Sequence, residues 1–139
     1  MTTNLQFQIG GTEHEFVRVD VVGSNGDGWL PSKISLSVGS FRGEFAADLD
    51  VWAFARFEKE LRTLYESLKG TASFSTYEQQ LELRLVGDGM GHVHVDGEAM
   101  DYAGTGNKLK FHLAIDQTAI PALLGDLAAI SAVHPPVAA

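Results

Sequence analysis

The chain has no cysteine among its 139 residues, which excludes disulfide bridges, thiolate metal sites and a thiol nucleophile. This composition fits a reducing compartment, and we expect a cytoplasmic protein. Basic residues are also scarce, since 10 Lys and Arg stand against 18 Asp and Glu, giving a formal net charge of −8. The basic residues never form a run, so we expect no nucleic-acid partner.

Long apolar runs are absent as well. No segment approaches the roughly 18 consecutive apolar residues that a membrane span requires, so we expect no membrane partner. Residues 1–4 lack the basic and apolar regions of a secretion signal. The glycine-rich loop at 23–28 lacks the Lys-Ser/Thr ending of a phosphate-binding loop, and no Gly-x-Ser-x-Gly occurs. The sequence therefore predicts neither an enzyme nor a cofactor.

What the sequence does contain is a series of short alternating apolar segments separated by glycine-rich turns. Strands are expected near residues 5–9, 16–22, 34–38, 41–45, 71–74, 81–85, 93–95 and 109–115. We expect one domain over residues 1–139, with an unordered tail at 134–139 after the helix that ends the chain. The pattern predicts an α+β fold, with an antiparallel twisted β-sheet of about six to eight strands packed by two helices.

The first helix is expected to follow Asp50, whose side chain is a typical N-cap. Apolar residues then recur at a spacing of three to four, and Gly70 provides a left-handed stop. Glu58 and Arg62 stand four residues apart on the opposite, solvated face.

The second helix is expected over residues 119–133, with Asp116 or Thr118 as its cap and Pro121 in its first turn. Asp126 is its only charged residue. A helix that is apolar nearly all round is either sandwiched in the core or supplies the interface of a homo-oligomer or partner.

Register can be predicted for the hairpin near residue 88. If apolar residues of both strands share one face, the turn holds an odd number of residues. A turn at residues 87–89 would set Arg84 opposite His92 and Glu82 opposite His94. A five-residue loop would instead place two acids opposite each other, which is unfavourable. Farther along, the apolar positions change from odd to even numbers at Gly97, which predicts a β-bulge there.

The only clustered histidines lie in the strand that follows this turn. His92, His94 and Asp96 share one face because side chains alternate along a strand, and His112 and Glu82 are expected on that face too. Imidazoles at this spacing can bind a divalent metal, so His92, His94 and His112 form a candidate metal site, either of a binding module or of a metal-dependent enzyme. The alternative is the solvated side of a half-exposed sheet.

Two tryptophans adjoin transitions between loops and regular elements. We expect Trp29 and Trp52 to pack in the core, the alternative being that they anchor a partner.

The acidic surface would steer association with a basic partner, such as a nuclease.

A set of landmarks in turns, caps and core positions extends over most of the chain. They are Trp29-Leu30, Phe41-Arg42-Gly43, Phe57, Glu60-Leu61, residues 64–70, Glu78, the segment Gly91-His92-Val93-His94-Val95, and Asp116-Gln117-Thr118. Their order resembles the bacterial immunity proteins of the WapI family, which neutralise the C-terminal toxin of a cell-wall-associated polymorphic toxin. The resemblance implies a cytoplasmic, non-enzymatic protein that binds a cognate toxin, and it assigns no contact residues.

Overall fold

The eight strands of the protein form two antiparallel four-stranded sheets, in a computed structural model that describes residues 5–11 and 14–136. The first sheet contains β1 (Leu5–Ile9), β2 (Glu15–Val21), β3 (Trp29–Val38) and β4 (Phe41–Asp50). The second contains β5 (Lys69–Ser75), β6 (Leu81–Asp88), β7 (His92–Met100) and β8 (Lys108–Asp116). The predicted α+β fold with antiparallel strands and two helices is confirmed, and the strands divide between two sheets.

Each sheet is followed by a helix. Helix α1 (Val51–Ser67) begins at Asp50, whose carboxylate accepts a hydrogen bond from the backbone N–H of Ala53 at 3.1 Å, as predicted for the N-cap. It ends earlier than predicted, at Leu68 instead of Gly70. Leu68 takes the left-handed conformation with φ of 62°, and its N–H donates to the Leu64 carbonyl. Strand β5 begins at the next residue, so Gly70 already belongs to the sheet.

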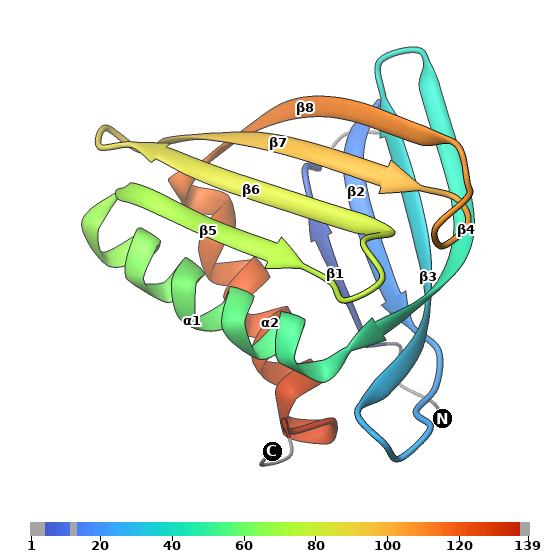
Figure 1. Cartoon of the computed structure of the whole chain (residues 1–139). Helices are drawn as coiled ribbons and strands as arrows, with labels where there is room; N and C mark the ends of the chain where they lie inside the picture. The colour runs from blue at the N-terminus through green and yellow to red at the C-terminus, as the bar shows by residue number, and fades with distance from the viewer. Residues whose placement is uncertain (1–4, 12–13, 137–139) are drawn as a thin grey trace.

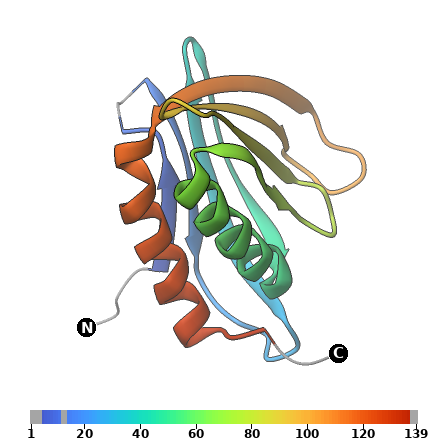
Figure 2. The same ribbon diagram turned by 90° about the vertical axis from the view of Figure 1, so that its left-hand side faces the viewer.

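The two sheets cross at a steep angle, with both helices on the inner side (Figure 1). Helix α1 contacts β5, and α2 (Ile120–Val133) lies beside α1 and β1 (Figure 2). Buried residues of both sheets and both helices form one hydrophobic cluster. At its centre, the rings of four phenylalanines lie with centroids 5.1 to 5.9 Å apart: Phe7, Phe54, Phe57 and Phe74. Edge contacts of this kind stabilise a core beyond the burial of area alone.

A buried polar side chain connects the sheets. Gln80 is 4 % exposed, and its amide donates to the carbonyls of Ala46 in β4 and Met100 in β7, at 3.3 and 3.2 Å. The backbone carbonyl of Gln80 in turn accepts from the backbone N–H of Met100 at 2.9 Å. These bonds fix the edge of the first sheet against the second, because a buried amide without partners would be costly.

The last helix is buried on one side only. A short 3₁₀ turn, η1 (Gln117–Ala119), precedes α2, and Asp116 caps that turn by accepting from the Thr118 N–H at 3.0 Å. The buried side consists of Ile120, Leu123, Leu124, Leu127 and Ile130. Pro121, Gly125 and Ala128 are exposed, so the helix is not sandwiched, and its use in a homo-oligomer stays a prediction. Residues 134–136 have no regular structure, while 137–139, the rest of the predicted tail, lie outside the described residues.

The hairpin between β6 and β7 has the predicted odd number of turn residues, but the turn lies two positions later. Arg84 pairs with Asp96, and Glu82 with Glu98, so the predicted pairs with His92 and His94 are wrong. Asp88 explains the shift. Its carboxylate accepts from the backbone N–H groups of Met90 and His92, at 2.7 and 3.1 Å, and thereby places the turn at residues 89–91.

The predicted β-bulge at Gly97 is also wrong. Strand β7 pairs without interruption to β6 and β8, and Gly97 and Ala99 continue the buried phase of Val95. The glycine serves packing instead. A Cβ atom at Gly97 would lie 2.3 Å from the ring of Phe111, which is directly opposite on β8. The Phe111 ring therefore occupies the space that a side chain at position 97 would need.

Candidate functional site

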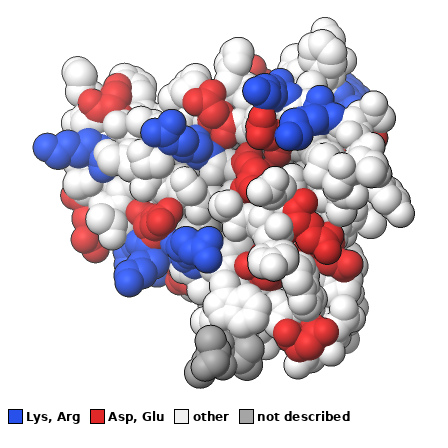
Figure 3. Space-filling view, viewed as in Figure 1, with Lys and Arg blue, Asp and Glu red and all other residues white. Residues whose placement is uncertain are grey.

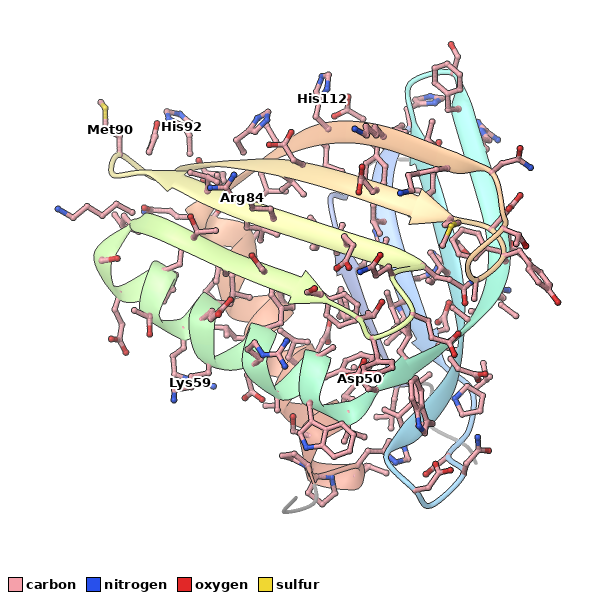
Figure 4. All side chains as sticks on the ribbon, viewed as in Figure 1. Asp50, Lys59, Arg84, Met90, His92 and His112 are labelled. Atoms are coloured by element: carbon pink, nitrogen blue, oxygen red, sulfur yellow. The ribbon has the colours of Figure 1, made fainter. Side chains whose placement is uncertain are left out.

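The predicted histidine face is the outer, solvent-facing side of the second sheet. His94 and His112 are stacked with ring centroids 6.1 Å apart, and both are exposed. His94 Nε2 lies 3.1 Å from Asp96 Oδ1, and His92 Nδ1 lies 3.0 Å from Asp88 Oδ2. Figure 4 shows His92 near the tip of the β6–β7 hairpin and His112 projecting from β8. His92 and His94 therefore interact with two different carboxylates, those of Asp88 and Asp96.

The structure does not gather these side chains around a common point. Within residues 5–11 and 14–136, no group of three or more His, Cys, Asp or Glu side chains is arranged to hold a metal ion. Glu82 lies two strands from His112 and opposite Glu98, away from the imidazoles. A metal site on His92, His94 and His112 stays a prediction.

The same face carries a regular array of charges beside a shallow hollow of about 450 Å³. Arg84 and Asp96 are cross-strand neighbours, and Lys110 Nζ lies 3.5 Å from Glu98 Oε1. Burial raises the pKa of the Glu82 carboxyl, and the carboxylate of Glu98 opposite it adds to this rise, whereas hydrogen bonds from Ser75 and Thr76 oppose it. Opposite charges thus face each other across the strands at two places, whereas Glu82 and Glu98 form a pair of like charges.

A second surface lies where the first sheet meets α1, and Asp50 organises it. One carboxylate oxygen of Asp50 caps α1, and the other accepts from the backbone N–H of Tyr77 at 2.9 Å. Asp50 is also the register partner of Trp29 at the start of β3. Asp50 is only 7 % exposed. Its carboxylate joins the start of α1 to the turn between β5 and β6, and Trp29, the first residue of β3, lies next to it. Its place near the start of α1 is labelled in Figure 4.

Three aromatic side chains surround this junction, and we call Trp29, Trp52 and Tyr77 the aromatic patch. Tyr77 is 82 % exposed, and its ring meets that of Trp29 edge-on, with centroids 5.9 Å apart. Trp52, 36 % exposed, is in the first turn of α1 and packs its ring over Gly28. A Cβ atom at Gly28 would lie 2.7 Å from that ring, and its φ of 94° also favours glycine.

The charges around the aromatic patch are acidic. Asp27 accepts from the Trp29 N–H at 3.2 Å, Asp48 pairs in register with Pro31 next to Trp29, and Glu78 follows Tyr77 in the turn. All three acids are exposed. Figure 3 shows Asp and Glu, and no Lys or Arg, over the lower right of this view, where β4 ends and the β2–β3 loop lies.

One basic residue next to the patch is neutralised within the sheet, while exposed Arg56 lies one helical turn after Trp52 in α1. Lys33 is the next residue on the same face of β3 after Pro31, and its Nζ lies 3.4 Å from Glu44 Oε1. The surface around the aromatic patch therefore combines the exposed rings of Trp52 and Tyr77 with exposed carboxylates.

The sequence indicated part of this surface. The prediction that Trp29 and Trp52 pack in the core is wrong, since neither belongs to the buried cluster. Trp52 is exposed and Trp29 is half-buried, and the alternative, that such a ring anchors a partner, stays a prediction. Tyr77 was missed altogether, although an aromatic residue among Ser, Thr, Glu and Gln in a turn is the signal that could have marked it.

None of the helices in the described parts of the chain is long and apolar enough to cross a membrane. Over residues 3–135 the chain matches the model of a protein family described as the WapI-like family of immunity proteins. No curated protein matches it.

Proposed function

We propose, from the premise that this chain belongs to the WapI-like immunity protein family, that it neutralises a cognate protein toxin by binding to it. The observation that carries this proposal is the extent of the family match, which covers both sheets and both helices. The chain acts as a binding protein without catalysis of its own, in the cytoplasm of the cell that makes it.

The chemistry of the surface supports binding. His92 and His94 of the second sheet each lie beside one carboxylate, Asp88 and Asp96, and both pairs are exposed to solvent. Exposed aromatic rings with surrounding charge, in contrast, are typical of surfaces that bind proteins. Exposed acids border such a surface, where they favour fast association with a basic partner.

The proposal is tested by co-expression. Each polypeptide encoded beside the gene for this chain is induced in a heterologous bacterial host, with and without the chain. We expect one of them to stop growth alone, and growth to resume when the chain is present. The same pair should form a stoichiometric complex by native mass spectrometry. A matched control carries an early stop codon in the gene for this chain, so that only the protein is lost.

Two results would contradict the proposal. Toxicity that persists at equal expression of both proteins would remove the neutralising role. Relief of toxicity without a complex, with the toxin altered covalently, would replace binding by an enzymatic mechanism.

A further inference from the structure

We infer that the aromatic patch, Trp29, Trp52 and Tyr77 with the acids around it, is the surface through which this chain binds its protein partner, and that the partner presents a basic surface with projecting arginine or lysine side chains. The inference rests on the proposed function and makes it specific, because it names the surface and the charge of the partner.

The first argument is exposure of the right residue types. Tyr and Trp are enriched among the residues that carry most of the energy of protein interfaces. Tyr77 keeps 82 % of its surface in contact with solvent and Trp52 keeps 36 %, yet they surround a single junction. Scattered exposed apolar residues need no explanation, but grouped rings do.

The second argument is rigidity. The Tyr77 backbone is fixed to Asp50, the Trp29 backbone to Asp27, and Trp52 follows the N-cap of α1 by two residues. The Val51 N–H also donates to the Gly28 carbonyl at 3.0 Å, which holds the loop under the Trp52 ring. Rings whose backbones are already ordered lose little conformational entropy on binding, so more of the contact energy becomes affinity.

The third argument is charge, which decides the occupant. Asp27, Asp48 and Glu78 border the rings, and Lys33 is paired with Glu44. A cation over an exposed Trp or Tyr ring gains from the quadrupole of the ring, and nearby carboxylates strengthen that attraction. An acidic or nucleic-acid partner would meet like charge here.

Other surfaces offer less. On the outer face of the second sheet, Lys110 is paired with Glu98 across the strands, and no Phe, Tyr or Trp side chain is exposed on the described strands β5 to β8. The groove of about 540 Å³ between α1 and α2 contains a single exposed aromatic ring among its described residues, that of Tyr65, and Arg62 and Glu66 of α1 bring charges of both signs to it. Its other wall consists mainly of small side chains of α2, which give a partner few anchors.

The test uses the full chain with the photoreactive amino acid p-benzoylphenylalanine at position 77, expressed in its own host. Position 90 is the matched control, because Met90 is 81 % exposed and lies at the far tip of the β6–β7 hairpin from Asp50 (Figure 4). We expect one polypeptide to be cross-linked at position 77 and not at 90, through a segment rich in Lys and Arg.

That polypeptide is then purified and its affinity measured. Tyr77→Ala should weaken binding by about 30-fold or more, as expected for an interface anchor. The pair Asp48→Lys with Glu78→Lys should slow association and make it less dependent on salt. Met90→Ala and Glu66→Lys, which change exposed residues far from the patch, should stay within about twofold.

The outcomes separate the two proposals. Cross-linking at 90 and not at 77, at neither position, or through a segment without basic residues would overturn the assignment of this surface. A toxin that the Tyr77→Ala and Asp48→Lys/Glu78→Lys variants neutralise as well as the unchanged chain would overturn it too, while the immunity function stands. A basic polypeptide that cross-links at 77 but is not toxic would leave the surface assigned and refute the immunity function.

Discussion

Replacement of Asp50 tests the junction that holds the aromatic patch. Asp50→Ala removes both acceptors at once. Loss of the N-cap costs about 1 kcal/mol, and a partly buried Tyr77 N–H without a partner costs about 1 to 2 kcal/mol more. We therefore expect the free energy of unfolding to fall by about 2 to 3 kcal/mol.

Asp50→Ser divides the two contributions. A serine hydroxyl at an N-cap can accept from Ala53, but it has no second oxygen for the Tyr77 N–H. Its loss should therefore be about 1 to 2 kcal/mol, between that of the unchanged chain and Asp50→Ala. Tyr77→Ala keeps the backbone N–H and removes only an exposed ring, so it should change stability by less than about 0.5 kcal/mol.

Equilibrium urea unfolding measures this series. For a domain of this size the slope is about 1 to 3 kcal/mol per molar urea, so Asp50→Ala should lower the midpoint by roughly 1 M. Hydrogen exchange of the Tyr77 amide should accelerate in both Asp50 variants and remain slow in Tyr77→Ala. Equal stability of Asp50→Ala and the unchanged chain, or equal loss in the Ala and Ser variants, would refute the shared role of the carboxylate.

Three further changes test the packing and charge of the second sheet. Gly97→Ala should destabilise the protein by about 1 to 3 kcal/mol, because its Cβ would displace the buried ring of Phe111; Phe111→Leu in the same chain should recover part of this in thermal unfolding. Gln80→Leu should cost about 1 to 3 kcal/mol by leaving two carbonyls without their donor, and a change below about 0.5 kcal/mol in urea would contradict its role between the sheets. Glu82→Gln should stabilise the protein by about 0.5 kcal/mol near neutral pH. The pKa of Glu82 is raised in the folded state, so its negative charge destabilises the fold only at higher pH. This destabilisation is absent below the ordinary pKa of 4.5 and grows as the pH rises through the raised pKa. The stabilisation by Glu82→Gln should therefore vanish near about pH 4. A gain that is equal at both pH values would show that it does not come from ionisation.

Several predictions that depend on neighbouring residues in the sequence were confirmed, although the helix stop expected at Gly70 lies at Leu68. The N-cap at Asp50 and the alternating strands follow from side chains within a few residues of each other. Asp116, by contrast, caps the 3₁₀ turn before α2 and not α2 itself, whose N-cap is Ala119 without a side-chain hydrogen bond. The resemblance to the WapI family likewise required only the order of landmarks along the chain, and the family match confirms it.

Predictions failed where one specific contact decided the outcome, whether that contact was local or came from another strand. The register of β6 and β7 follows from the hydrogen bonds of Asp88 to Met90 and His92. The requirement for an odd number of turn residues left the position of the turn open. Gly97 was interpreted as a bulge because the sequence does not show that Phe111, on another strand, needs the space beside it. Leu68 took the left-handed position because β5 begins at once after it.

The sequence by itself thus determined the class of fold, most element positions and the family, because these depend on local periodicity, caps and residue order. Only the tertiary structure decided how the strands divide into two sheets and where the candidate binding surface lies. Trp29, Trp52 and Tyr77 come from a strand, a helix and a turn, and they meet through Asp50, which bonds to Tyr77 27 positions later in the chain. No local pattern encodes such a meeting, because it arises from the packing of α1 and the second sheet against the first.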